Sequence, residues 1–193
     1  MHDFRDDIEQ YLNRLSDVIR QLDRDQINSA MNAILETYEK EGRIFIFGNG
    51  GSGSMASHFT CDFNNGVSLG LKKRFNFVCL TDNMPTMLAI ANDEGYENVF
   101  VLQLDNRLRK DDVILAISGS GNSENVIRAV EYAKKKGNKV IALTGYDGGK
   151  LLKLADHPIH VNINDMQKAE DMYIIIDHMM SQIIAAKLGK KMC

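Results

Sequence analysis

Ile114-Leu-Ala-Ile-Ser-Gly-Ser-Gly-Asn-Ser-Glu-Asn-Val126 is the stretch around which the rest of the chain is organised. It begins as an apolar run, Val113 to Ile117, with the length and composition of a buried strand. A turn rich in glycine and serine follows at 118–123, and apolar residues then recur at helical spacing from Val126. The pattern therefore predicts a strand, a tight turn and a helix.

The start of this predicted helix is suited to binding an anion. The first backbone amides of a helix lack intrahelical partners, and the helix dipole is positive at that end. Ser118, Ser120 and Ser123 can add hydroxyl donors. No Gly-Lys-Ser/Thr follows, so the stretch is not a nucleotide P-loop. It favours a phosphate ligand, and the alternative is an ordinary turn capped by serine.

A second strand and turn of the same kind lie earlier in the chain. Residues 44–47 are apolar, the glycine-rich segment 48–54 follows directly, and a helix is predicted from about Ser54. Small residues in such a turn let a ligand approach the main chain closely. Ligands of parallel sheets bind at the carboxyl ends of strands, so the two turns are predicted to face one ligand.

Predicted strands and predicted helices alternate along the rest of the chain, and this order predicts a mainly parallel sheet covered by helices on both faces. Residues 3–40 carry apolar side chains at helical spacing, interrupted at 23–25, and predict two helices with Gly42 as the C-terminal cap. This arm packs either on its own sheet or on another subunit. Further strands are predicted at 75–80, 139–144 and 159–162, and helices at 84–91, 98–108, 123–136, 150–155 and 166–188.

The composition indicates a globular cytoplasmic protein. The chain has 193 residues, 44% of them hydrophobic and 25% charged, enough for one domain with a full core. A net charge of −3 gives no reason to expect nucleic acid or a membrane as partner. Cys61, Cys79 and Cys193 follow no metal or disulfide spacing, and the charged opening is unlike a signal peptide.

Two pairs of polar residues could carry chemistry. His58 and Asp62 are four residues apart on one predicted helix, and Glu170 and His178 are eight apart on the last one, so each pair shares a helix face. Two histidines and two carboxylates suit a zinc-type site, whereas ordinary surface pairing is the alternative. Other polar residues could bind sugar hydroxyls or only form turns: Asp82, Asn92, Asp93, Tyr146 and Asp147.

Four motifs together resemble the sugar isomerase (SIS) domain, and in particular its sedoheptulose-7-phosphate isomerase (phosphoheptose isomerase) branch. The resemblance extends over nearly the whole chain. The motifs are, in order, Gly48-Asn-Gly-Gly-Ser52, Ala89-Ile-Ala-Asn-Asp-Glu-Gly-Tyr96, Ile117-Ser-Gly-Ser-Gly-Asn-Ser123 and Ala142-Leu-Thr-Gly-Tyr-Asp-Gly-Gly149.

The resemblance implies a flavodoxin-like three-layer α/β/α sandwich with a five-stranded, mainly parallel sheet. Residues 1–193 would form a single domain, with a helical arm at 1–42 and an α/β core at 43–193. It also implies a homotetramer in which the N-terminal helices pack between subunits and active sites lie at subunit interfaces.

Substrate-binding positions follow from the same resemblance. The family often has threonine where this chain has Gly119, which removes a hydroxyl but keeps the backbone amide. The implied substrate-binding residues are Asn49, Gly50, Gly51, Ser52, Asn92, Asp93, Ser118, Gly119, Ser120, Ser123 and Glu170.

The family's zinc ligands, which are His, Glu, Gln and His, fall on His58, Asp62, Glu170 and His178. Asp62 is one methylene shorter than the family's Glu, and Glu170 replaces a neutral Gln with an anion. Both remain competent oxygen ligands, and the added charge favours one divalent metal ion, zinc, per active site.

The implied activity is isomerisation of sedoheptulose 7-phosphate to D-glycero-D-manno-heptose 7-phosphate through an enediol. Asp62 would be the base and His178 the acid, while the metal would polarise the carbonyl. A carboxylate bound to metal is a weaker base, so the two roles of Asp62 compete. The alternatives are a non-catalytic phosphosugar-binding regulator or adaptor, and the same chemistry on another phosphosugar such as a hexose phosphate.

Overall fold

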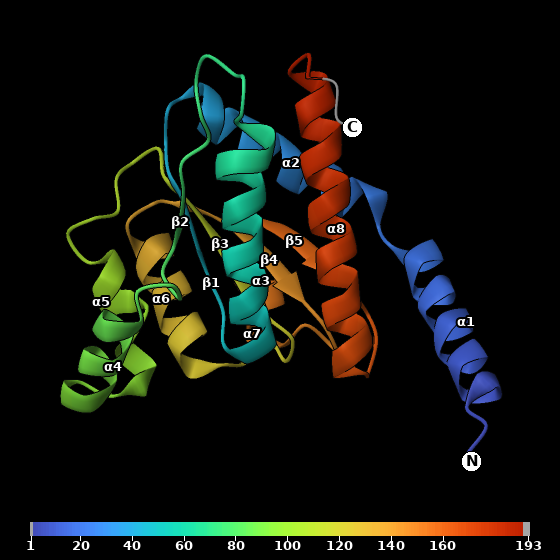
Figure 1. The fold of residues 1–193 in the computed structure, drawn as a ribbon. Coiled ribbons are helices and arrows are strands. Elements are labelled where there is room, and N and C mark those ends of the chain that lie inside the picture. The colour runs from blue at the N-terminus through green and yellow to red at the C-terminus, as the bar shows by residue number, and fades with distance from the viewer. Residues whose placement is uncertain (1, 191–193) are drawn as a thin grey trace.

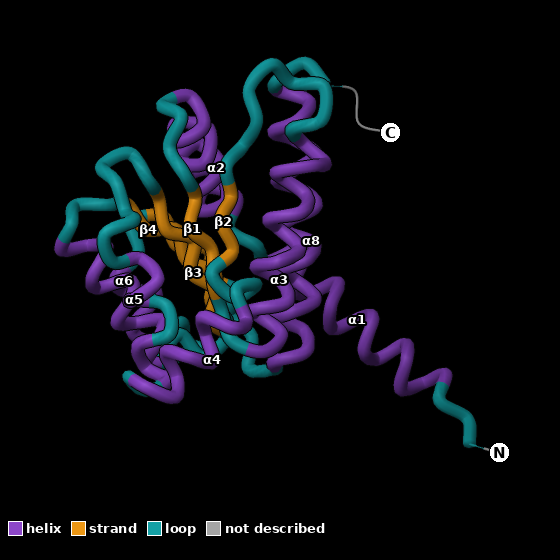
Figure 2. The backbone as a smooth tube through the Cα atoms, turned by 60° about the vertical axis from the view of Figure 1, so that its left-hand side comes forward, coloured by secondary structure: helices purple, strands orange, loops and turns teal. Residues whose placement is uncertain are grey.

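The computed structural model describes residues 2–190, and Cys193 lies outside them. Its centre is one sheet of five parallel strands in the order β2-β1-β3-β4-β5 (Figures 1 and 2). This confirms the predicted fold class. The strands are β1 (Ile44–Phe47), β2 (Phe77–Cys79), β3 (Val113–Ser118), β4 (Lys139–Thr144) and β5 (His157–His160).

The strand order reverses between β1 and β3, which places a ligand-binding crevice at their carboxyl ends. The two strands pair along the whole of β1, from Ile44 opposite Val113 to Phe47 opposite Ala116. The turns that follow β1 and β3 therefore leave the same edge of the sheet side by side. This geometry brings the two turns together, as their sequences predict.

Helices cover both faces of the sheet. One face carries α2 (Arg24–Glu39), α3 (Gly50–Cys61), a π-helical turn η1 (Asp62–Val67) and α8 (Met166–Lys187). The other carries α4 (Met84–Asp93), the 3₁₀ turn η2 (Tyr96–Asn98), α5 (Val101–Leu104), α6 (Glu124–Lys135) and α7 (Gly149–Leu154). Alternate residues of β1, β2, β3 and β4 enter the two cores, which is why these strands are largely apolar, whereas the edge strand β5 contributes Ile159 to one core.

The N-terminal arm consists of two helices that behave differently. Asp23 caps the start of the second helix, because its side chain accepts hydrogen bonds from the N–H groups of Asp25 and Gln26 at 2.9 and 3.1 Å. Helix α2 packs against β5 and α8, whereas α1 (Arg5–Gln21) projects from the body and contacts α8 near its start (Figure 1). No helix over residues 2–190 has both the length and the apolar character needed to cross a membrane.

Several element ends differ from the predictions. Helix α3 begins at Gly50 rather than near Ser54, so the glycines form its first turn. Strand β5 begins at His157, two residues before the predicted start, since an edge strand tolerates Pro158. The helix predicted at 98–108 is short because Asp105 leaves the helical conformation and Asn106 has φ +58°.

The cap of α2 is formed by a different residue than predicted. Glu41 has the left-handed conformation, with φ +58°, and Gly42 follows it. The N–H groups of Glu41 and Gly42 donate to the carbonyls of Tyr38 and Thr37 at 3.1 and 2.9 Å, which is a Schellman arrangement. Position 42 requires glycine for a different reason, because any Cβ there would collide with the carbonyl of Asp111.

Candidate functional site

The turn between β3 and α6 presents hydroxyl groups at a helix N-terminus. Ser118 ends the strand and Ser123 precedes the helix, and their Oγ atoms lie 3.3 Å apart. The side chain of Ser123 makes no capping hydrogen bond to its own helix, so its hydroxyl is available to a ligand. Gly121 has φ +63° and lies against the carbonyl of Gly148, which leaves no room for a side chain.

The turn between β1 and α3 brings a second helix N-terminus to the same place. Asn49 precedes α3 and Ser52 is buried in its first turn. Gly48, Gly50 and Gly53 have the spacing of the dinucleotide-binding fingerprint, in which glycines allow close approach of strand, helix and ligand. A Cβ at Gly48 would lie 2.8 Å from the Ile117 carbonyl oxygen, so the two turns pack directly against each other.

These two turns enclose a cavity of about 200 Å³, which we call the serine cavity. Unpaired amides from two helix N-termini and several hydroxyls suit it to an anion. The structure thus brings together most of the predicted substrate-binding residues. The serine cavity is lined by Asn49, Ser52, Ile117, Ser118, Gly119, Ser120, Ser123, Met166 and Glu170.

Other predicted residues lie outside the serine cavity. Gly50 and Asp82 line a neighbouring, larger cavity of about 620 Å³. Asn92 and Asp93 are exposed at the end of α4, where the Asn92 amide donates to the Asp93 carboxylate at 2.7 Å. Asp147 accepts a hydrogen bond from the N–H of Gly149 at 3.2 Å, which is turn chemistry.

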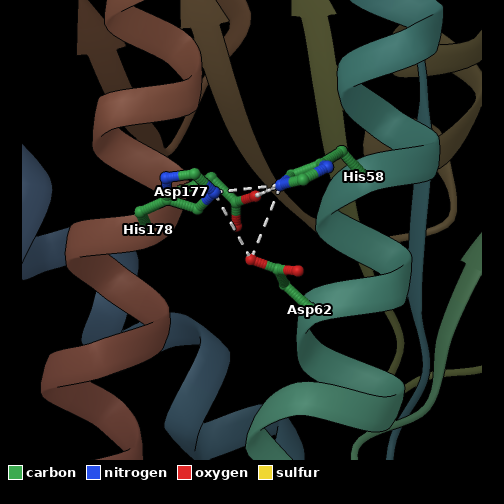
Figure 3. A group of neighbouring side chains, drawn as sticks. All are labelled: His58, Asp62, Asp177 and His178. Carbon is green, nitrogen blue, oxygen red and sulfur yellow. Dashed lines mark hydrogen bonds and ion pairs between the residues drawn. The ribbon is translucent and has the colours of Figure 1, made fainter. Parts of the chain in front are cut away.

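A group of four side chains lies between α3 and α8 (Figure 3). The Nε2 atoms of His58 and His178 are 3.0 Å apart. Oδ2 of Asp62 is 3.7 and 3.8 Å from these two nitrogens. Oδ2 of Asp177 is 3.7 Å from Nε2 of His58. One donor atom from each residue therefore lies within 4.8 Å of every other.

Local structure explains how Asp62 reaches the histidines. His58 and Asp62 are four residues apart, so both face α8. Helix α3 changes into the wider π-helical turn η1 at Asp62. Such turns often occur at functional positions because they redirect side chains.

Asp177 is the member of this group that the sequence analysis missed. Its side chain is fully buried, and neither carboxylate oxygen has a hydrogen-bond donor among residues 2–190. Burial, together with the smaller effect of the nearby Asp62 carboxylate, raises the pKa of Asp177 to about 8. An acidic residue inside the apolar run Ile174-Ile-Ile-Asp-His-Met179 is the signal that could have revealed it, since burying a lone carboxylate is costly.

Glu170, which the family's ligand pattern places in the metal site, lies elsewhere. Its carboxylate faces Gly51, where any Cβ would collide with it, and it lines the serine cavity. Seven residues separate Glu170 from Asp177, and seven separate Gly51 from His58. At a rise of about 1.5 Å per residue, the serine cavity and the four-residue group are about 10 Å apart along both helices.

The four side chains fit a divalent metal ion. Imidazole nitrogens and carboxylate oxygens are the ligands of catalytic zinc, and tetrahedral ligands at about 2.0–2.2 Å from zinc lie about 3.3–3.6 Å from one another. Four of the six separations, 3.0 to 3.8 Å, bracket that range, and the other two lie within 4.8 Å. A cation would also compensate the two buried oxygens of Asp177, which the protein leaves without donors.

Comparison with known proteins places this geometry in a family. The SIS domain model matches residues 8–145. The chain is 36% identical over 168 residues to a phosphoheptose isomerase of Helicobacter pylori (strain P12), covering 87% of each chain. It is 32% identical over 178 residues to a probable phosphoheptose isomerase of Thermoplasma volcanium, covering 92% of this chain and 90% of that one.

Solved structures agree with these matches. A phosphoheptose isomerase from Neisseria gonorrhoeae superposes with a TM-score of 0.86 at 28% identity, covering 95% of this chain and all of that one. The sugar isomerase domain of an RpiR transcription factor from Sphaerobacter thermophilus has a TM-score of 0.66 at 18% identity and shares the fold alone. The chain therefore belongs to the SIS domain family, in its phosphoheptose isomerase branch.

Proposed function

We propose that this protein is an aldose–ketose isomerase that converts sedoheptulose 7-phosphate to D-glycero-D-manno-heptose 7-phosphate. The observation that carries this function is the convergence of His58, Asp62, Asp177 and His178 beside a cavity suited to phosphate. Relatives named phosphoheptose isomerase, at 32 and 36% identity over most of the chain, support the same assignment.

The phosphate group binds in the serine cavity. Amides at the starts of α3 and α6, together with the hydroxyls of Ser52, Ser118, Ser120 and Ser123, supply the donors. The binding energy of this remote group holds the reacting end of the sugar in position.

The length of the site supports a long substrate. A seven-carbon chain with a terminal phosphate, extended at about 1.2 Å per bond, reaches about 10 Å, whereas a five-carbon chain reaches about 7 Å. The four-residue group lies about two helical turns from the serine cavity, a separation that the longer chain matches better than the shorter one. A heptose phosphate is therefore favoured over a pentose phosphate.

The proton transfers fall to Asp62 and His178. Oδ2 of Asp62 faces both histidines, and its other oxygen takes the proton from C1 of the ketose. His178 supplies a proton to O2, which gives the enediol, and this role competes with metal binding through Nε2 just as the two roles of Asp62 compete. The imidazole then removes the proton from O1 while the Asp62 carboxylic acid returns its proton to C2, and the aldose results.

One divalent metal ion, zinc, would be held by His58, Asp62, Asp177 and His178. When bound, it polarises the substrate carbonyl. Asp177 takes the position in this set that the family pattern gives to Glu170, because Asp177 is the carboxylate whose oxygens lack donors. Glu170 instead faces the substrate from the wall of the serine cavity.

A screen of five- to seven-carbon sugar phosphates, with and without chelator, tests the function. We expect ketose-to-aldose conversion of sedoheptulose 7-phosphate that chelator removes and Zn²⁺ restores. Tight sugar-phosphate binding without any turnover would instead support the alternative, a non-catalytic phosphosugar-binding regulator or adaptor.

The assembly is proposed to be a homotetramer of single-domain chains, each with an arm at 1–42 and a core at 43–193. Support comes from α1 and the residue that precedes it, since Phe4, Ile8 and Leu12 are 60, 56 and 57% exposed within one chain. A second subunit would cover them. A cytoplasmic location is favoured by Cys61 and Cys79, which are free thiols.

A further inference from the structure

The side chain of Asn49 is held by two residues that have no place in the mechanism above. Its Oδ1 accepts hydrogen bonds from the Tyr96 hydroxyl at 2.8 Å and from Nδ2 of Asn125 at 3.0 Å. Its Nδ2 donates to Oδ1 of Asn125 at 2.9 Å. The two amides therefore form a reciprocal pair that joins the start of α3 to the start of α6.

One backbone group fixes the orientation of both amides. The N–H of Val126 donates to Oδ1 of Asn125 at 2.9 Å, and a backbone N–H is only a donor. The atom of Asn125 that faces it must therefore be the oxygen. The atom of Asn49 that meets this oxygen must then be Nδ2, and Oδ1 of Asn49 is left to the Tyr96 hydroxyl and to Nδ2 of Asn125.

The hydrogen-bond count leaves Asn49 with one unused group. Its oxygen accepts two bonds, which fills both lone pairs. Its nitrogen carries two hydrogens, and only one has a partner among residues 2–190. Asn49 lines the serine cavity, the larger cavity beside it and a third cavity of about 490 Å³ that Tyr96 and Asn125 also line, so a ligand in this region can reach the residue that carries the free N–H.

The geometry points to Asn125 and Tyr96 as positioning residues that keep Asn49 turned as a hydrogen-bond donor toward an oxygen of the substrate. This inference rests on the proposed isomerase function. Asn125 is 2% exposed and is not a member of the four-residue group, and Tyr96 begins η2, just after the end of α4 that carries Asn92 and Asp93. The acceptor is an oxygen of the phosphate or of a sugar hydroxyl.

Two variants test the orientation of Asn49. Tyr96→Phe removes one bond to Oδ1 of Asn49, and because Tyr96 is 54% exposed the protein should keep its Tm. Asn125→Asp keeps the shape but sets a carboxylate oxygen against Oδ1 of Asn49. We expect the KM for sedoheptulose 7-phosphate to rise about threefold in Tyr96→Phe and about tenfold or more in Asn125→Asp, with kcat within about twofold of wild type.

Matched controls separate positioning from structural damage. Tyr132→Phe removes a hydroxyl that donates to Asp105 at 2.9 Å, far along α6 from Asn125. Asn138→Ala removes a buried amide that bonds the Arg109 and Asp112 carbonyls at the opposite end of the sheet. Both should leave KM unchanged, although Asn138→Ala should lower the Tm.

Calorimetric titration with sedoheptulose 7-phosphate and with inorganic phosphate identifies the acceptor. Weaker binding of both ligands in the variants assigns it to the phosphate, and weaker binding of the sugar phosphate alone assigns it to a hydroxyl. Wild-type KM and wild-type binding of both ligands in both variants would overturn the inference. Absence of turnover by the wild-type protein would count against the isomerase function, while the binding measurements would still report on Asn49.

Discussion

Asp177 is the residue whose burial most strongly favours a bound cation between α3 and α8. A fully buried carboxylate without donors is unfavourable unless it is neutral or bound to a cation. Burial raises its pKa to about 8, with the Asp62 carboxylate adding to the effect. Because its folded-state pKa is raised, the contribution of Asp177 to the stability of the metal-free protein should be fully present below the unfolded-state pKa of about 3.9 and be lost as the pH rises through about 8.

Exchange of single carboxylates distinguishes the two candidate ligands. Asp177→Asn should weaken Zn²⁺ binding by at least about tenfold, since it removes a charged ligand. Glu170→Gln, the matched control, should bind Zn²⁺ within about twofold of wild type. Competition with a chromophoric chelator measures both affinities. If Glu170→Gln loses Zn²⁺ binding and Asp177→Asn does not, then Glu170 is the metal ligand and Asp177 is not.

Removal of either proton-transfer group should separate catalysis from binding. Asp62→Asn and His178→Ala are expected to reduce kcat by at least about a hundredfold, because each removes a group that moves a proton. Binding of the phosphate ester should change little, since the serine cavity lies about 10 Å away along α3. Turnover assays and calorimetry give the two quantities, and full activity of both variants would exclude these roles.

At the scale of elements, the two turns that form the serine cavity depend on close backbone packing. Gly121 lies against the Gly148 carbonyl, and its own carbonyl accepts the N–H of Leu151 at 2.9 Å. The turn after β3 is thereby fixed to the turn after β4. The shape of the serine cavity depends on these contacts between turns.

Gly121→Ala should therefore destabilise the protein and weaken phosphate binding together. Its φ of +63° strains any other residue by about 1–3 kcal/mol, and the new Cβ would also meet the Gly148 carbonyl. Gly137→Ala is the control, because φ is +84° there but no atom lies within 4 Å of the added Cβ. Thermal unfolding and phosphate titration should show a lower Tm in both variants and weaker phosphate binding in Gly121→Ala alone.

The sequence predicted the elements better than their ends. Continuous apolar runs predicted the central strands β1, β3 and β4, because these three are buried on both faces, whereas the edge strand β5 has only Ile159 fully buried. The start of α3 at Gly50 and the end of α5 before Asn106 were missed, since both depend on backbone conformations that apolar spacing does not encode.

At the scale of the whole molecule, the projecting arm carries the apolar side chains on which the proposed tetramer rests. Tyr11 bonds Asp171, and Lys168 lies 3.9 Å from the centre of the Tyr11 ring, so one side of α1 is anchored to α8. Ile8 and Leu12 remain exposed on α1.

Charge on that exposed side should disrupt assembly. Ile8→Glu with Leu12→Glu is expected to shift a tetramer toward smaller species, because the carboxylates would have to be buried at the interface. Glu9→Gln, an exposed polar exchange on the same helix, should leave the mass unchanged. Sedimentation measures the masses, and a tetramer that persists in the double variant would exclude α1 from the interface.

The sequence by itself determined the sheet, the two glycine- and serine-rich turns and the family, because these depend on local patterns of apolar, small and hydroxyl side chains. It also identified His58, Asp62 and His178 as candidate site residues, because they match the family's pattern of metal ligands. Only the tertiary structure decided that Asp177 joins them and that Glu170 faces the serine cavity. The physical reason is that α3 and α8 are 104 residues apart in sequence, from Asp62 to Met166, and which of their side chains meet depends on how the two helices pack.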